Sequence, residues 1–170
     1  IVFAEEMMRC GSVGLVCSLG SSAIAVPPIL ALGTEEQKQK YVPPALAGDL
    51  IAVLGITEPS GGSDVANLLT KAVRKGDNYI VNGSKTFITS GTRADFVTTA
   101  VRTGGPGFGG ISLLIIEKGT PGFTTSKKID KMGWLASDTA ELAFDDCEVP
   151  VKNLLGEENH GFIGIMVNFQ

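Results

Sequence analysis

The chain has 170 residues, of which 44% are hydrophobic, and its formal net charge is -4. This length can bury one core and suits one domain, or one domain with pieces of its neighbours. The acidic balance excludes nucleic acid as the main partner, because phosphate binding requires basic patches. No apolar run is expected to approach the roughly 20 residues that span a membrane. The chain starts with Ile1 in a mid-helix pattern, so we expect an excerpt of a longer protein.

Residues 1–47 are predicted to be helical. Met8, Leu15 and Leu19 recur at helical spacing, and Pro27-Pro28 ends that segment or opens a short one. Thr34-Glu-Glu-Gln37 has the form of a capping box, so a helix should start at Thr34 and run toward Pro43.

From Leu50 the sequence pattern changes to short predicted strands separated by Gly and Asn. Asn82-Gly83 is typical of a tight turn. The predicted strands cover 69–75, 79–81, 84–89, 96–101, 111–116, 123–126 and 141–149, and a helical pattern resumes from His160 to Gln170. The pattern predicts an α+β fold: N-terminal helices, then a β-barrel-like or sandwich-like middle domain, then the start of a C-terminal helix. The expected boundaries are 1–49, 50–155 and 156–170.

The three cysteines form no Cys-x-x-Cys pair, and His160 is the only histidine. A zinc site is therefore not expected, and no metal ligand is assigned. Cys10 and Cys17 lie seven residues apart and are interpreted as buried side chains on one helix face. Sparse, unpaired cysteine fits a reducing compartment, and cytoplasm and mitochondrial matrix both stay open.

The segment Gly55-Ile-Thr-Glu-Pro-Ser-Gly-Gly-Ser-Asp64 follows an apolar stretch. Gly61 and Gly62 let the backbone approach a ligand closely, because they carry no Cβ. Thr57 and Ser63 add hydroxyl groups beside the free amides. Such a loop could bind a phosphate or the polar edge of a planar ring. Taken alone, a loop of small residues is usually a plain turn.

A second candidate segment is Phe87-Ile-Thr-Ser-Gly91, at the end of a predicted strand. Simple alternation would place Phe87 and Thr89 on one strand face. A flat ring could then pack against Phe87 while Thr89 bonds its edge. The alternative is an ordinary core Phe with a strand Thr.

Together the two segments resemble the acyl-CoA dehydrogenase family. The resemblance includes Gly33-Thr-Glu-Glu-Gln-Lys-Gln-Lys-Tyr-Val-Pro43, Asn82 to Gly91, Lys131-Met-Gly133, Ser137-Asp-Thr139, Val149-Pro150 and Asn153-Leu-Leu-Gly156, and it covers essentially the whole chain. The stretch Thr-Glu-Pro-Ser-Gly-Gly-Ser-Asp is the most specific part. In this family the middle β-domain holds FAD against a C-terminal helical bundle.

The resemblance implies a set of FAD contacts. Thr57 would lie near the pyrimidine edge of the flavin, Phe87 beside the ring in a place often taken by Trp, and Thr89 close to N5. Ser63 would reach the pyrophosphate of FAD and also adjoin the acyl-CoA substrate. Glu58 and Asp64 are expected to brace the loop through backbone amides. The full predicted set of cofactor contacts is Leu54, Ile56, Thr57, Gly62, Ser63, Phe87, Ile88 and Thr89.

The same resemblance implies a reaction and partners. The family oxidises acyl-CoA to trans-2-enoyl-CoA by removing the α-proton and passing the β-hydride to flavin N5, then gives its electrons to an electron-transferring flavoprotein. The base is a glutamate expected beyond Gln170, so no catalytic residue is named and the 170 residues alone are expected to be inactive. The intact enzyme would be a homo-oligomer, a dimer or tetramer. Alternatives are a flavin monooxygenase or acyl-CoA oxidase on the same fold, or a non-catalytic relative kept for assembly.

Overall fold

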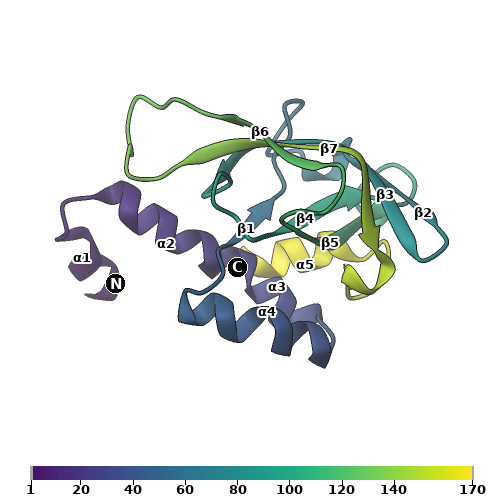
Figure 1. Ribbon diagram of the computed structural model, residues 1–170, viewed down its shortest axis with the longest axis horizontal. Coiled ribbons are helices and arrows are strands. Elements are labelled where there is room, and N and C mark those ends of the chain that lie inside the picture. Colours follow the sequence, from purple (N-terminus) through teal and green to yellow (C-terminus); the bar gives the residue numbers. More distant parts are fainter. Residues whose placement is uncertain (1, 170) are drawn as a thin grey trace.

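The computed structural model describes residues 2–169, in which helices lie along one side of a curved sheet (Figure 1). The helices are α1 (Val2–Met8), α2 (Val13–Ala25), α3 (Pro27–Leu32), α4 (Glu35–Ala47) and α5 (Gly161–Asn168). The strands are β1 (Ala52–Gly55), β2 (Lys71–Lys75), β3 (Asn78–Thr89), β4 (Phe96–Arg102), β5 (Ile111–Glu117), β6 (Phe123–Lys128), β7 (Thr139–Pro150) and β8 (Leu154–Leu155). The predicted α+β class is confirmed.

The helical run predicted for residues 1–47 is divided into four helices. Gly11, at φ +72°, separates α1 from α2, and Pro27 opens α3 at a position where its missing amide costs nothing. The capping box at Thr34 is confirmed, with the side chains of Thr34 and Gln37 each accepting the other's backbone amide. These short helices are therefore started and stopped by local sequence signals.

Helix α4 runs past Pro43 to Ala47, which confirms the helical prediction through residue 47. Two prolines remove two amide donors, which normally ends a helix. Here Tyr41, Val42 and Ala45 are buried in the core, and their burial keeps the last turn helical. The helix ends at Gly48, whose φ of +85° suits only a residue without Cβ.

The cysteine interpretation is wrong for the first pair. Cys10 is exposed in the break between α1 and α2, and Cys17 is half-buried. Because the helix is interrupted at Gly11, the two side chains share no continuous helix face. Cys147, on β7, is buried, and all three thiols are free.

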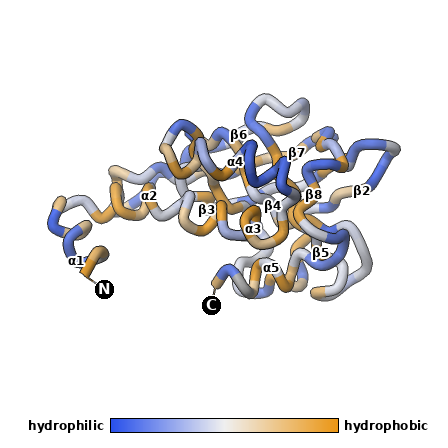
Figure 2. The backbone as a smooth tube through the Cα atoms, turned by 90° about the horizontal axis from the view of Figure 1, so that it is seen from below, coloured by the Kyte–Doolittle hydropathy of each residue, from blue (hydrophilic) through white to orange (hydrophobic). Residues whose placement is uncertain are grey.

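Residues Val13–Leu32 form a 20-residue stretch with mean hydropathy 1.9, apolar enough by length and composition to cross a membrane. The expectation that no apolar run approaches this length is therefore wrong. Figure 2 shows the stretch as largely hydrophobic. In the structure it is two helices that meet at Val26, and 28% of it is buried. A single such stretch is weak evidence for a span, because core helices pass the same test.

The strands form one mixed sheet in the order β6-β7-β3-β2-β4-β5-β8, with β1 pairing in parallel with β4. Within residues 2–169 no pairing joins the outer strands β6 and β8, so the barrel-like expectation is refined to an open, curled sheet. Strands β3 and β7 form its long antiparallel pair, and the β6–β7 hairpin reaches over α2 (Figure 1).

The tight turn predicted at Asn82-Gly83 is wrong, because β3 runs without a break from Asn78 to Thr89. The pairing with β7 shifts register at Gly83, whose φ is +147°. A Cβ on Gly83 would lie 2.7 Å from Thr70, so glycine here serves a bulge and a close approach. The predicted strands 69–75 and 79–81, in contrast, are confirmed, and β2 and β3 pair there as an antiparallel hairpin.

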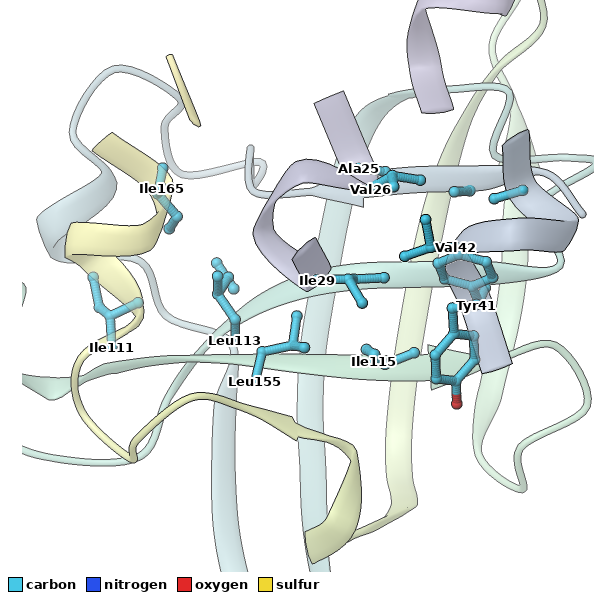
Figure 3. Packing of buried hydrophobic residues seen from close by; sticks show 14 of the residues in the cluster. Ala25, Val26, Ile29, Tyr41, Val42, Ile111, Leu113, Ile115, Leu155 and Ile165 are labelled. Atoms are coloured by element: carbon cyan, nitrogen blue, oxygen red, sulfur yellow. The ribbon is translucent and has the colours of Figure 1, made fainter. Parts of the chain in front are cut away.

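Two hydrophobic clusters hold the fold together. One is formed mainly by strand residues and includes Tyr79, Val97 and Leu142. The other lies between the sheet and the helices, where Ile29 of α3, Tyr41 of α4 and Ile165 of α5 meet β5 (Figure 3). Strands β4 and β5 carry buried residues on both faces, which explains their continuous apolar sequences. The sheet thus has a helix-covered face, and the candidate site lies at its border.

Candidate functional site

A small cleft lies where β1 and β3 end against α2. Its volume is about 170 Å³. The residues that line it are Ser21, Ile24, Leu54, Ile56, Thr57, Phe87, Ile88, Thr89 and Phe169. Six of the eight cofactor contacts predicted from the sequence are in this set, although they come from two segments about 30 residues apart in the chain. The structure therefore brings the two candidate segments together in one place.

The two remaining predicted residues lie beside the cleft. Gly62 packs next to Thr57, since a Cβ on Gly62 would lie 3.2 Å from the Thr57 Cγ2 atom. Ser63 is exposed in the following part of the loop and does not line the cleft. Thr89 lines the cleft and Ser63 does not. Ser63 is next in the chain to Gly62, which packs against the cleft residue Thr57.

The end of β3 has an unusual backbone. Phe87 has φ +58° and Ser90 has φ +61°, in the left-handed region that residues with a Cβ rarely adopt. The pairing of β3 with β7 shifts between Lys85 and Ile88, so simple alternation does not describe this segment. The argument that placed Phe87 and Thr89 on one strand face is therefore wrong. The bulge still leaves both side chains on the cleft, with Phe87 66% exposed.

A strained backbone that is held by its surroundings is a feature of ligand sites. At this site the Ser90 amide donates to the carbonyl oxygen of Asp138, over 2.9 Å. The Asp138 carboxylate accepts the backbone amide and the hydroxyl of Thr92 and pairs with Arg93 at 2.8 Å. Burial raises the pKa of Asp138, but the bonds from Thr92 and Arg93 outweigh it and hold that pKa below its ordinary value.

The loop after β1 is braced by Glu58, as predicted. Its carboxylate accepts the backbone amides of Leu69 and Thr70. Asp64 differs from the prediction, because its carboxylate accepts the side-chain amide of Asn67 at 2.7 Å. Both acids therefore shape the loop, and neither lines the cleft.

Lys85 is a residue that sequence reasoning missed. Its ammonium is fully buried and lies 2.8 Å from a Glu58 carboxylate oxygen and 3.0 Å from the Ile56 carbonyl oxygen. Burial lowers the pKa of Lys85 to about 8, against the opposing effect of Glu58. Burial also raises the pKa of Glu58, but Lys85 and the amides outweigh it, and the net shift is downward.

Helix α2 supplies two of the three lining residues that were missed, and the third, Phe169, follows α5. Ser21 and Ile24 line the cleft, and the Ser21 hydroxyl lies 3.3 Å from that of Ser90. No local pattern distinguishes these two positions from their neighbours on the helix, because their role depends on how α2 packs on β1.

A larger cavity of about 620 Å³ lies between helices α2 to α4 and the loop after β3, and it shares Ser21 with the small cleft. Its walls are mainly aliphatic, and none of the predicted site residues lines it. We take the smaller cleft as the candidate site because hydroxyl groups, an aromatic ring and a close-approaching glycine loop converge there.

The cleft has the chemistry that a flat heteroaromatic ring requires. Leu54, Ile56 and Ile88 offer apolar contacts, and the hydroxyls of Thr57 and Thr89 can bond polar atoms on a ring edge. The side chain of Phe87 is exposed toward the opening, where a ring could stack. The residues present therefore fit a flavin, with Gly62 allowing the loop to approach it.

Helices packed on an open curled sheet, with a cleft at the strand ends, define an α+β segment that carries a candidate ligand site. Residues 53–147 match the acyl-CoA dehydrogenase middle domain, and residues 1–49 match the acyl-CoA dehydrogenase N-terminal domain. The chain belongs to the acyl-CoA dehydrogenase family, which confirms the resemblance found in the sequence.

Individual relatives agree with the family match. The chain is 48% identical to acyl-CoA dehydrogenase AFT10-1 of Alternaria alternata, over 99% of this chain and 39% of that protein. It is 43% identical to mitochondrial isovaleryl-CoA dehydrogenase of Pongo abelii, over 98% of this chain and 40% of that protein. A probable acyl-CoA dehydrogenase structure from Mycobacterium abscessus superposes with TM-score 0.91 at 61% identity, covering 93% of this chain and 42% of that one. The chain thus spans about two fifths of the length of these relatives.

Proposed function

We propose that the protein containing this chain is an FAD-dependent acyl-CoA dehydrogenase that converts acyl-CoA to trans-2-enoyl-CoA. The observation that carries the proposal is the convergence of Thr57, Phe87 and Thr89 on one cleft. These residues come from separate segments, and the resemblance to the acyl-CoA dehydrogenase family implies a flavin contact for each of them. Family membership supports the same reading, because enzymes of this family depend on FAD in general.

FAD would supply the acceptor for the hydride that leaves the β-carbon of the substrate. The residues of this chain bind and orient the ring: Leu54, Ile56 and Ile88 contact it, and Thr57 and Thr89 bond its edge. Phe87 excludes water from one side. Ser63 is proposed to contact the pyrophosphate of FAD and to adjoin the acyl-CoA, because the exposed loop that carries it leads away from the cleft.

The proton at the α-carbon requires a carboxylate base. By its family resemblance the protein takes this base from a glutamate outside the 170 residues, so these residues alone should not turn over acyl-CoA. Electron-transferring flavoprotein as electron acceptor, and a homo-oligomeric enzyme, are proposed on the same ground. For the compartment we propose cytoplasm or mitochondrial matrix, supported by the three free thiols.

The test is direct. The full-length protein should purify with bound FAD, lose its visible flavin absorbance on anaerobic addition of a saturated acyl-CoA, and release the 2-enoyl product. Acyl-CoA thioesters of different length and branching should be compared, since isovaleryl-CoA dehydrogenase is among the relatives. Protein that carries no flavin would refute the proposal. Rapid reoxidation by O₂ after reduction would instead favour an oxidase or monooxygenase.

A further inference from the structure

Lys85 occupies an environment that charged side chains rarely tolerate. Its side chain is fully buried, and that of its partner Glu58 is 4% exposed. Removing two charges from water costs several kcal/mol for each, and replacing such a pair by apolar residues is often neutral or stabilising. Stability alone is therefore a poor reason for this pair. Its position suggests another role.

The ammonium group of Lys85 connects β3 to the segment of Ile56, Thr57 and Glu58, which we call the 56–58 segment. It donates to the Ile56 carbonyl oxygen at 3.0 Å and to the Glu58 carboxylate at 2.8 Å. Ile56 and Thr57 both line the candidate cleft. The two contacts of Lys85 thus bracket Thr57 on either side.

The bulge in β3 adds a third connection. Between Lys85 and Ile88 the strand leaves its register with β7, and the Thr86 amide donates to the Thr57 carbonyl oxygen at 2.9 Å. Consecutive residues of β3 therefore hold three consecutive residues of the 56–58 segment. Directly after them comes Phe87 with its left-handed φ of +58°.

Gly55 makes room for this arrangement. A Cβ on Gly55 would lie 3.0 Å from a methyl group of Val97 and 3.6 Å from the Lys85 Cγ atom. The aliphatic stem of Lys85 therefore passes over a residue without a side chain to reach the far end of β1. Glu58 in turn fixes the loop that follows, through the amides of Leu69 and Thr70.

We propose that Lys85 and Glu58 are positioning residues of the flavin site, whose buried ion pair sets the distance between the 56–58 segment and the Phe87–Thr89 segment. The inference rests on the proposed function, because the two segments that the ion pair positions are those that line the proposed FAD cleft. Neither residue lines the cleft, so both act through the backbone that carries Ile56 and Thr57. Without the ammonium, the Ile56 carbonyl and the buried Glu58 carboxylate would both lose a donor.

The test uses the full-length enzyme with FAD removed and added back. Lys85→Met keeps the length of the stem and removes the ammonium. We expect the Kd for FAD to rise at least tenfold and the visible absorption spectrum of bound flavin to change. The matched control is Lys40→Met, which breaks the 2.6 Å pair between Lys40 on α4 and Glu117 on β5, away from the cleft. The control should bind FAD within twofold of wild type.

Because Lys85→Met leaves a buried carboxylate unpaired, a second variant guards against simple misfolding. Lys85→Met/Glu58→Gln contains no unpaired buried charge and keeps one side-chain oxygen, which can accept the amide of either Leu69 or Thr70. It should recover part of the thermal stability lost in Lys85→Met while its Kd for FAD stays at least tenfold weaker. A purely structural pair would change stability and leave FAD affinity and the flavin spectrum of the folded protein unchanged.

Three results would overturn the inference. If folded Lys85→Met binds FAD within twofold of wild type, the ion pair does not position the two segments that line the cleft. A double variant that fails to fold would show that the pair is required for folding and has no separate role in positioning the FAD cleft. Wild-type protein that binds no FAD would overturn this inference and the proposed function together, whereas the first two results leave the proposed function intact.

Discussion

The backbone amide of Thr86 donates to the carbonyl oxygen of Thr57 at 2.9 Å, which joins the two candidate segments by main chain. This bond exists because the bulge in β3 turns Thr86 away from β7. The hydroxyl of Thr57 and that of Thr89, three residues beyond Thr86, consequently line the same cleft. The first two predictions test this geometry.

Thr89→Val should keep the fold and slow reduction of the flavin in the full-length enzyme. Valine has nearly the shape of threonine but cannot bond the ring edge. The loss of one buried hydrogen bond is worth about 1–3 kcal/mol, or about 5- to 150-fold in rate. Rapid mixing with acyl-CoA measures this rate directly. The control is Thr124→Val on exposed β6. Equal rates in both variants would remove the role assigned to Thr89.

Gly62→Ala tests how closely the glycine loop approaches Thr57. The added Cβ would lie 3.2 Å from the Thr57 Cγ2 atom, so Thr57 must shift. We expect a cost of about 1 kcal/mol, which raises the Kd for FAD about fivefold. Gly61→Ala is the matched control, since its Cβ would meet nothing within 4 Å. Titration of both apo-proteins with FAD separates them, and identical affinities would contradict the proposed approach.

Local signals in the sequence predicted most elements correctly. The capping box at Thr34 and the β2–β3 hairpin follow from residues close together in the chain. Phe87 shows where this fails: a left-handed aromatic residue has no sequence signature, because the bulge that imposes it depends on β7. The same holds for Lys85, which in Ser-Lys-Thr resembles a solvent-facing strand residue. Only the position of Glu58 in three dimensions makes its burial possible.

The site followed the same rule. Six lining residues were predicted because the sequence around them resembles the acyl-CoA dehydrogenase family. Ser21 and Ile24 were missed, since α2 reaches the cleft only through its packing on the sheet. The extent of α4 was predicted correctly although Pro43 and Pro44 lie inside it, and burial of Tyr41 and Ala45 keeps its last turn helical.

Asp138 should make stability depend on pH in the acid range. Its pKa in the folded protein lies below the ordinary value of 3.8, so the folded state binds fewer protons than the unfolded state there. The stabilisation is present above that ordinary value and is lost as pH falls through the lower folded pKa. Asp138→Asn should therefore be less stable than wild type by about 2 kcal/mol near pH 6, with a difference that shrinks below about pH 4. Denaturant unfolding across this range measures it. A constant difference would contradict the assignment.

Gln37 should matter more to stability than its capping partner. Thr34→Ala removes only the side-chain acceptor for the Gln37 amide, at 3.2 Å, and should cost about 1 kcal/mol. Gln37→Ala removes the other half of the box and also two bonds, of 2.8 and 2.9 Å, to the carbonyl oxygens of Lys152 and Leu154. Those bonds tie α4 to the end of the sheet, and Gln37 is only 6% exposed. We expect a loss of about 2–3 kcal/mol, measured by urea unfolding of the full-length protein. Equal costs for the two variants would show that the contacts to Lys152 and Leu154 contribute nothing to stability.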